Sequence, residues 1–380
     1  MSNLPTTSWQ EHLSKLVTSL RESGALTDPR WIEAFYAVPR HVFIPATTYR
    51  TAQERDAWLR GIYRDDTVVT ATTHHPTLGI EIPTSSSTRP SLMARMLELL
   101  DVHDGMRVLE IGTGTGYNAG LLTHRLGGSN VTSIDVDPAF IAHARHALHT
   151  LNLSPHLIVG DGTHGAAERA PFDRIIATCA VAAIPPPWIT QLAPAGKMLV
   201  NLRGEIAGGE LCLLTKDRTG DEEVIGPFLT IAGHFMWARH RPTQTLPYEI
   251  RPTSERDQNR IITYPTTVTE ICRNIDNPDF RFLAQLHIPG IRVLSTARER
   301  EEVTLRAETT DGSWVRADSD GRVSQGGIRR LWDSLHTTHT MWRDLNHPCP
   351  VRFGVVANLS TQFVYLDHDT SWTRWPLPLL

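Results

Sequence analysis

Apolar residues recur along the chain with two different periods, and the change of period outlines its elements. Near the start they repeat at three- and four-residue intervals over residues 9–20, directly after Ser8, a good helix-capping residue. A second helical stretch opens at Asp28-Pro29 and reaches Pro39. We therefore expect N-terminal helices within residues 8–40.

Between residues 105 and 215, short apolar runs alternate with helical stretches. Alternation of this kind predicts a parallel sheet with helices on both faces, and so an α/β fold. The apolar runs are, in order, "RVLEI", "VTSIDV", "LIVGDG", "FDRIIAT", "KMLVNL" and, as an added strand, "ELCLLTK".

Residues 50–90 keep neither period and contain the hydroxyl-rich run "TSSSTRP" before the amphipathic run "SLMARMLELL". We expect a long irregular loop that leads into a helix, and such loops are often functional. Hydroxyl residues ahead of a helix are also common caps. Ser86, Ser87 and Thr88 are therefore open to both interpretations.

The composition shifts toward Arg, Thr, Asp and Pro after residue 241. "EVTLRAETTDGSWVRAD" predicts a hairpin that turns at Asp311-Gly312, and "VRFGVVANL" and "QFVYLD" predict two further strands. One helix face is marked by Ile328, Leu331, Trp332, Leu335, Trp342 and Leu345. The expected organisation is a domain over residues 1–240 and a smaller α+β domain over residues 241–380.

Composition narrows the class of protein. The formal net charge of -4 supplies no global field for nucleic acid or an anionic membrane, and no stretch is long and apolar enough to span a bilayer. The 4 cysteines form no CxxC pair, which suits a reducing compartment, and the 18 histidines form no HExxH motif. We expect a cytoplasmic protein without metal, nucleic-acid or membrane partners.

The segment "VLEIGTGTGYNAGLL" at 108–122 carries the most specific signal. A glycine loop between a strand and a helix presents main-chain N–H groups and lets a ligand approach the backbone. Gly112, Gly114 and Gly116 read GxGxG, one residue tighter than the GxGxxG that a dinucleotide pyrophosphate requires. The spacing therefore disfavours a dinucleotide.

Two acids follow at strand ends, each of which could also be a simple helix cap. Asp135 stands where an acid would accept hydrogen bonds from ribose hydroxyls. Asp161, at the end of the next strand, would accept a hydrogen bond from an exocyclic amine. Together with the loop they indicate a site for S-adenosylmethionine, with Glu110 orienting the loop or lying near the cation. The candidate cofactor-binding residues are Glu110, Gly112, Thr113, Gly114, Thr115, Gly116, Asn118, Asp135, Val136, Asp161 and Gly162.

On these segments the chain resembles the protein-L-isoaspartate O-methyltransferase family. The matching stretches are "VPRHVFIP" (38–45), "TSSSTRPSLMARMLELL" (84–100), the glycine loop and "GDGTHGAAERAPFDRIIATCAVAAIPPPWITQL" (160–192). The resemblance implies a Rossmann-like class I methyltransferase sheet. It also implies methyl transfer from S-adenosylmethionine to a peptide carboxylate, which leaves S-adenosylhomocysteine and leads through a succinimide.

The family places a hydroxyl residue two positions before a proline, usually serine in a Thr-Ile-Ser-x-Pro context. Here that position is Thr88, ahead of Pro90, with Ser86 and Ser87 beside it. The resemblance implies that Thr88, Ser87 and Ser86 are the candidate catalytic residues. Threonine and the serine run keep the hydroxyl but alter the shape near the acceptor, which bears on substrate choice.

"GGIRRLWDSLHTTHTMW" and "VRFGVVANLSTQFVYLD" resemble, more loosely, C-terminal extensions of family relatives that accompany ribosomal lanthipeptides. The preferred hypothesis is an enzyme that methylates a normal aspartate in a modified, possibly cyclised precursor peptide and so introduces isoaspartate. Residues 241–380 would then recognise the peptide. The alternatives are an isoaspartate repair enzyme acting on damaged proteins and a non-catalytic binding module.

Overall fold

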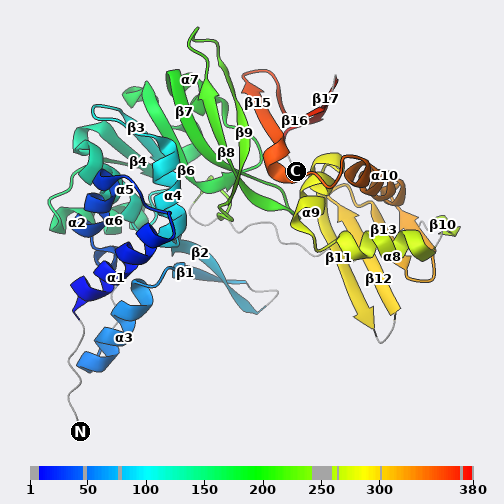
Figure 1. Cartoon of the computed structure of the whole chain (residues 1–380), viewed down its shortest axis with the longest axis horizontal. Coiled ribbons are helices and arrows are strands. Elements are labelled where there is room, and N and C mark those ends of the chain that lie inside the picture. Colours follow the sequence, from blue (N-terminus) through cyan, green and yellow to red (C-terminus); the bar gives the residue numbers. More distant parts are fainter. Residues whose placement is uncertain are drawn as a thin grey trace.

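The computed structural model describes residues 8–45, 49–75, 79–241, 259–262, 265–299, 302–368 and 371–378. They form a main lobe, which holds residues 8–241 and 353–376, and a small lobe, which holds residues 259–344. Figure 1 shows the two lobes side by side, with the β1–β2 hairpin projecting between them on the lower side. No helix within the described ranges is long and apolar enough to cross a membrane.

The main lobe is built on a ten-stranded sheet with the order β17-β16-β15-β9-β8-β7-β6-β3-β4-β5. Its strands from β3 to β7 pair in parallel, which confirms the predicted α/β class, and the remaining pairs are antiparallel. The parallel strands are β3 (Val108–Ile111), β4 (Val131–Asp135), β5 (His156–Val159), β6 (Phe172–Val181) and β7 (Leu192–Arg203). The antiparallel strands are β8 (Gly208–Lys216), β9 (Glu223–Ala232), β15 (Phe353–Asn358), β16 (Gln362–His368) and β17 (Ser371–Pro376).

Helices cover both faces of this sheet because its strands are apolar on both sides. Ile176 on β6 belongs to the core under the N-terminal helices, whereas its neighbour Ile175 belongs to the core shared with the small lobe. The first face carries α1 (Trp9–Glu22), α2 (Pro29–Ala37), α4 (Pro90–Leu100), α5 (Tyr117–Leu126) and α6 (Pro138–Thr150). The second face carries α7 (Pro186–Gln191) and α9 (Pro278–His287).

The N-terminal helices begin where the sequence indicates. The side chain of Ser8 caps α1 by accepting a hydrogen bond from Glu11 N, and Asp28 caps α2 with Pro29 at its first position. Residues 50–90, however, are more regular than expected. They contain α3 (Ala52–Ile62), which a Thr51/Glu54 capping box opens, and the antiparallel pair β1 (Val68–His75) and β2 (Ile80–Ser87).

The chain returns to the first sheet at its C-terminal end. β15 pairs antiparallel with β9, so residues 353–376 extend the main sheet instead of belonging to the small lobe. This differs from the expected division into 1–240 and 241–380. The physical reason is that the side chains of residues 353–357 are buried on both faces of the strand. Such a strand has to lie in a sheet that is covered on both faces.

The small lobe is a five-stranded antiparallel sheet with the order β10-β14-β13-β12-β11, and α8 and α10 pack on it. The predicted hairpin turns at Gly312, whose φ is +84°. Ile328 was placed on a helix face wrongly: it precedes the helix, and 85% of it is exposed. The elements are β10 (Asn259–Ile262), α8 (Pro265–Asn274), β11 (Ile291–Glu299), β12 (Glu302–Thr309), β13 (Trp314–Asp318), β14 (Arg322–Gly326) and α10 (Leu331–Asp344).

The two lobes share an aromatic and polar contact through α9. The centroid of the Phe282 ring lies 5.0 Å from the ring centroid of Phe228 on β9 and 5.1 Å from that of Phe353 on β15. The side-chain oxygen of Gln285 accepts a hydrogen bond from Ile206 N at 2.9 Å. Helix α9 therefore fastens the small lobe to the antiparallel half of the main sheet.

Candidate active site

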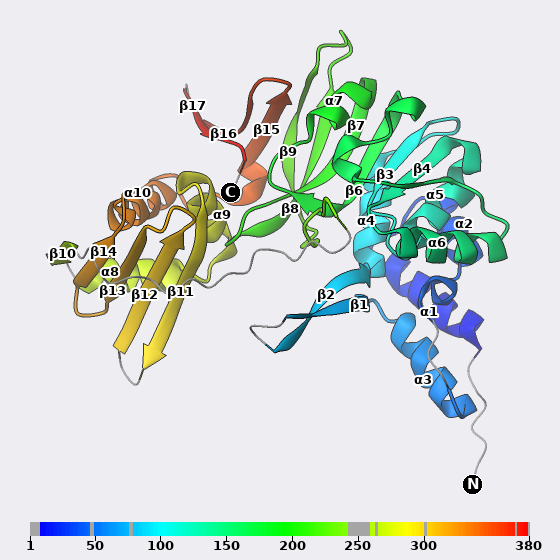
Figure 2. The same ribbon diagram turned by 180° about the vertical axis from the view of Figure 1, so that it is seen from behind.

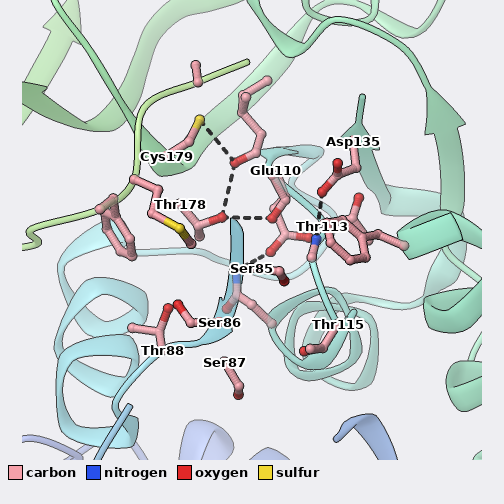
Figure 3. Close-up of a pocket in the computed structure, with 18 of the residues that line it drawn as sticks. Ser85, Ser86, Ser87, Thr88, Glu110, Thr113, Thr115, Asp135, Thr178 and Cys179 are labelled. Atoms are coloured by element: carbon pink, nitrogen blue, oxygen red, sulfur yellow. Dashed lines mark hydrogen bonds between the residues drawn. The ribbon is translucent and has the colours of Figure 1, made fainter. Parts of the chain in front are cut away.

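A cavity of about 340 Å³ opens at the carboxyl ends of β3, β4 and β6, where parallel α/β sheets commonly bind ligands. Three segments bound it: the glycine loop after β3, the hydroxyl run at the end of β2, and a crossing segment over residues 233–239. Figure 3 shows the hydroxyl run facing the glycine loop across this space. Segments that are far apart in sequence thus meet at one site.

The glycine loop is held tightly against β6. Gly112 has φ +96°, and a Cβ there would lie 2.8 Å from Thr178 Oγ1, which donates a hydrogen bond to Gly112 O at 2.7 Å. Gly116 has φ +89° and lets α5 approach α6, since a Cβ would lie 2.7 Å from the Ala144 Cβ. Gly112 therefore lines the cavity, whereas Gly116 serves helix packing and lies outside the lining.

Glu110 is the most buried acid of the site, with no exposed surface. It accepts hydrogen bonds from Asn118 Nδ2 at 2.7 Å and from Ser133 Oγ at 2.5 Å. Burial raises the pKa of the Glu110 carboxyl to about 7. Beside it, Asn118 Oδ1 and Tyr117 OH are buried in the cavity wall without a hydrogen-bond partner among the described residues, which is unusual for buried polar atoms.

Asp135 ends β4 in the cavity wall. Its carboxylate accepts hydrogen bonds from Gly114 N at 2.8 Å and Asp137 N at 3.0 Å, while burial raises the pKa of the group. A carboxylate offers about four lone-pair sites, so acceptor capacity remains for a ligand. Thr113, Thr115, Val136 and Gly162 line the same cavity.

Asp161 already has protein partners, and its role toward an exocyclic amine stays a prediction. It accepts hydrogen bonds from Thr163 N at 2.9 Å, Thr163 Oγ1 at 2.7 Å and His240 Nδ1 at 2.8 Å. It lies outside the cavity lining, although its neighbour Gly162 is part of it. The carboxylate thus stabilises a short turn and holds the end of the crossing segment.

The hydroxyl run alternates because it is the end of a strand. Ser85 and Ser87 are buried, and their hydroxyls bond to Thr70 and Arg40. All four residues from Ser85 to Thr88 line the cavity, but the hydroxyls of Ser86 and Thr88 have no hydrogen-bond partner within the part of the chain that the structure describes. Figure 3 shows these two side chains together, with Ser87 pointing away.

None of these hydroxyls caps the helix that follows. The N-cap of α4 is Arg89, and no side chain makes a capping hydrogen bond. The capping interpretation is therefore wrong for Ser86, Ser87 and Thr88, because β2 runs directly into the helix. Their backbone is instead held by hydrogen bonds from a buried side chain.

That support comes from Arg40, which has no exposed surface. Its guanidinium donates to Ser87 O and Thr88 O at 3.1 Å, to Ser87 Oγ at 3.2 Å and to Ile62 O at 2.6 Å. Within the described chain no carboxylate makes a salt bridge with it. The buried guanidinium of Arg40 therefore fixes the backbone of the hydroxyl run and places a positive charge behind it.

The family model described as Protein-L-isoaspartate(D-aspartate) O-methyltransferase matches residues 11–226. The chain belongs to this family. Protein-L-isoaspartate O-methyltransferase 2 of Syntrophobacter fumaroxidans is 33% identical over 204 residues, covering 53% of this chain and 73% of the relative. The enzyme of Parvibaculum lavamentivorans is 35% identical over 210 residues, covering 54% and 83%.

A solved structure titled protein-L-isoaspartate O-methyltransferase aligns with both lobes. It covers 94% of this chain and 100% of its own, with a TM-score of 0.56 and 21% identity. At that identity the likeness shows the fold alone. The two-lobed fold is therefore shared with a solved structure that carries this name.

As a protein-L-isoaspartate O-methyltransferase family member, the chain is a methyltransferase that uses S-adenosylmethionine. The residues present fit that cofactor. Asp135 supplies an acceptor at the end of β4, and Asn118 Oδ1 and Tyr117 OH are buried polar atoms without partners in the described residues. A tight glycine loop brings main chain to the cavity without the wider phosphate spacing.

The crossing segment is the part of this methyltransferase site that the sequence did not reveal. Met236 O accepts a hydrogen bond from Ala180 N, and Ala238 N donates to Ala180 O, both at 2.8 Å. Arg239 lies over the Phe140 ring at 6.0 Å. The segment carries no repeat or motif, and long-range contacts bring it to the cavity: its pairing with the end of β6 and the hydrogen bonds of Phe235 with Asn201 and Arg203.

Two other features restrict the chemistry of the site. Burial raises the pKa of the Cys179 thiol to about 12, so this cavity residue stays a neutral thiol at physiological pH. Among the described residues no group of three or more His, Cys, Asp or Glu side chains could hold a metal ion.

Proposed function

We propose that the protein transfers the methyl group of S-adenosylmethionine to the α-carboxylate of L-isoaspartyl residues in peptides and proteins. The observation that carries this is the pair of partnerless hydroxyls, Ser86 and Thr88, in the wall of the cavity that also holds Asp135 and the glycine loop. Free hydroxyl donors suit an acceptor carboxylate. When bound, the cofactor supplies an electrophilic methyl group.

Such a transfer needs little acid–base chemistry. A carboxylate is ionised at neutral pH, so no strong general base has to activate it. The residues of this chain supply alignment, which can remove about 7–11 kcal/mol of a barrier. Thr88 and Ser86 would hold the acceptor oxygens by hydrogen bonds, and the charge of Arg40 behind them favours an anion.

The product is a methyl ester on the isoaspartyl residue. The neighbouring backbone nitrogen would then attack the ester carbonyl, and methanol would leave as the succinimide ring closes. Water opens this ring to aspartate or isoaspartate. These later steps need no group of the enzyme, and the four free thiols of the chain suit a cytoplasmic setting for this work.

A second candidate is methylation of a normal aspartate in a cyclised ribosomal peptide. The specific observation in its favour is the serine run, with Thr88 where the family usually has serine. The small lobe does not decide between the two, because a solved isoaspartate methyltransferase aligns with both lobes. A constrained peptide could present a side-chain carboxylate to the same two hydroxyls.

Mass spectrometry of three substrates separates these candidates. The protein is incubated with S-adenosylmethionine and a linear isoAsp-Gly peptide, its linear Asp-Gly isomer, or a cyclised Asp-Gly peptide. Methylation of the linear isoaspartyl peptide alone, followed by loss of methanol, is the expected result. Modification of the cyclic aspartyl peptide alone would favour the second candidate, and no modification of any substrate would contradict both.

A further inference from the structure

The β1–β2 hairpin continues the cavity wall outward into solvent. Its root is part of the site, because Thr67, Val69 and the residues from Pro83 to Thr88 line the cavity. The outer part is open, since Thr72 and Thr73 are exposed and Ile80 is 52% exposed. In Figures 1 and 2 the hairpin projects from the main lobe without a helix on it.

Among the described residues, β1 and β2 pair only with each other, so each has a free edge. An isolated two-stranded hairpin is marginally stable in water. Its outer residues include Thr72, Thr73, Ile80 and Ile82, whose β-branched side chains suit strand pairing, beside the cross-strand pair His74 and Glu81. The hairpin is therefore a template for a third strand.

The register shows which edge is the better template. Thr72 pairs with Pro83, and the ladder is regular from there to His75 and Ile80. Proline has no N–H, and within sheets it is found at outer edges, at the first residue of a strand or at bulges. The register shifts between Ala71 and Thr72, next to this pair, and both strands are outer edges. On an outer edge the position without an N–H faces outward. In an antiparallel ladder its partner then directs its own N–H and C=O outward too. Thr72 thus offers both groups on the free edge of β1, whereas Pro83 lacks a donor on the edge of β2.

We propose that the substrate chain flanking the acceptor residue adds as a strand to the free edge of β1. This inference rests on the proposed function and concerns its substrate. Main-chain hydrogen bonds tolerate any side chain, which suits an enzyme whose acceptor residues occur in varied sequences. Val69 lines the cavity, and Thr72 follows three residues later, beyond the two register shifts of this ladder. At about 3.3 Å per residue, Thr72 lies at most about 10 Å farther along the chain.

Substrate length is therefore the first test, and it uses the full chain without mutation. A short isoaspartyl peptide with about two residues on each side of the acceptor does not reach Thr72, whereas one with about seven does. We expect KM to be about three- to tenfold lower for the long peptide, with kcat similar, because the added contacts are hydrogen bonds. Equal KM values for both lengths would overturn the proposal.

Thr72→Pro, which removes the outward N–H, supplies the second test, with Thr72→Val as its matched control. We expect the proline variant to lose the KM advantage of the long peptide and to keep wild-type KM and kcat for the short one. The valine variant retains the N–H and should behave as the wild type. Normal turnover of the short peptide shows that the site is intact.

A proline variant that keeps the full advantage of the long peptide would contradict strand addition at β1. N-methylation of alternate flanking amides in the long substrate probes the same bonds from the other side, and it should raise KM to the short-peptide value. If the wild-type protein methylates neither length, the proposed function fails. If it methylates both equally well, only the proposed docking fails.

Discussion

The two sides of the cavity are built differently. On the cofactor side, Gly112 is held by Thr178, Gly114 by Asp135, and Glu110 by two side chains. There only Asn118 Oδ1 and Tyr117 OH are buried without a partner among the described residues of the cavity wall. On the acceptor side, the hydroxyls of Ser86 and Thr88 lack partners in the described residues, and the adjoining hairpin is exposed. We call the first the rigid side, because the protein's own hydrogen bonds fix most of it, and the second the open side, because two of its hydroxyl donors have no partner among the described residues.

The largest effect should come from the rigid side. We expect Asp135→Ala to weaken S-adenosylhomocysteine binding about a thousandfold. The variant would lose the two charge-assisted hydrogen bonds expected to the ribose hydroxyls, together with the acceptor that holds Gly114 N. Calorimetric titration measures this loss. Asp137→Ala is the control: it removes only the cap of α6 and should leave affinity nearly unchanged. Wild-type affinity in Asp135→Ala would refute the assignment.

The open side should separate catalysis from cofactor binding. We expect Thr88→Val to lower kcat/KM for an isoaspartyl peptide about 100-fold, since a positioned donor is lost. Its affinity for S-adenosylhomocysteine should not change. Thr88→Ser keeps the hydroxyl and should keep most activity. Full turnover by the valine variant would show that Thr88 does not hold the acceptor.

A substitution of Arg40 tests whether the hydroxyl run on the open side needs its buried support. Arg40→Lys replaces a planar fork by an ammonium with three donors, so several carbonyls beneath the hydroxyl run lose their partner. We expect a loss of about 2 kcal/mol in the free energy of unfolding, measured by urea titration. The variant should also show a higher KM for peptide. Unchanged stability would mean that the buried guanidinium does not support this loop.

The smallest effect concerns the pH dependence of the cofactor side. The pKa of Glu110 is raised to about 7, so the carboxyl is neutral below that pH and ionised above it. Affinity for the cationic S-adenosylmethionine, relative to the neutral S-adenosylhomocysteine, should rise about threefold from about pH 6 to about pH 8. Glu110→Gln should flatten this ratio. An identical slope in both proteins would exclude Glu110 as its source.

The sequence predicts the cofactor side better than the acceptor side, for a physical reason. The glycine loop and Asp135 follow local strand–turn–helix chemistry, and the structure places them in one cavity. The crossing segment depends on pairing between Ala180 and Trp237, and β15 on pairing with β9, and neither long-range contact leaves a local pattern. The hydrogen bond between His240 and Asp161 depends on the same segment, so the sequence did not predict it.

The measurement that tests the account most directly is a structure of the protein with S-adenosylhomocysteine and an isoaspartyl peptide bound together. The account predicts that the ribose contacts Asp135 and that an α-carboxylate oxygen of the peptide lies within hydrogen-bond distance, about 3 Å, of Thr88 Oγ1. A peptide carboxylate held away from both Thr88 and Ser86 would contradict it.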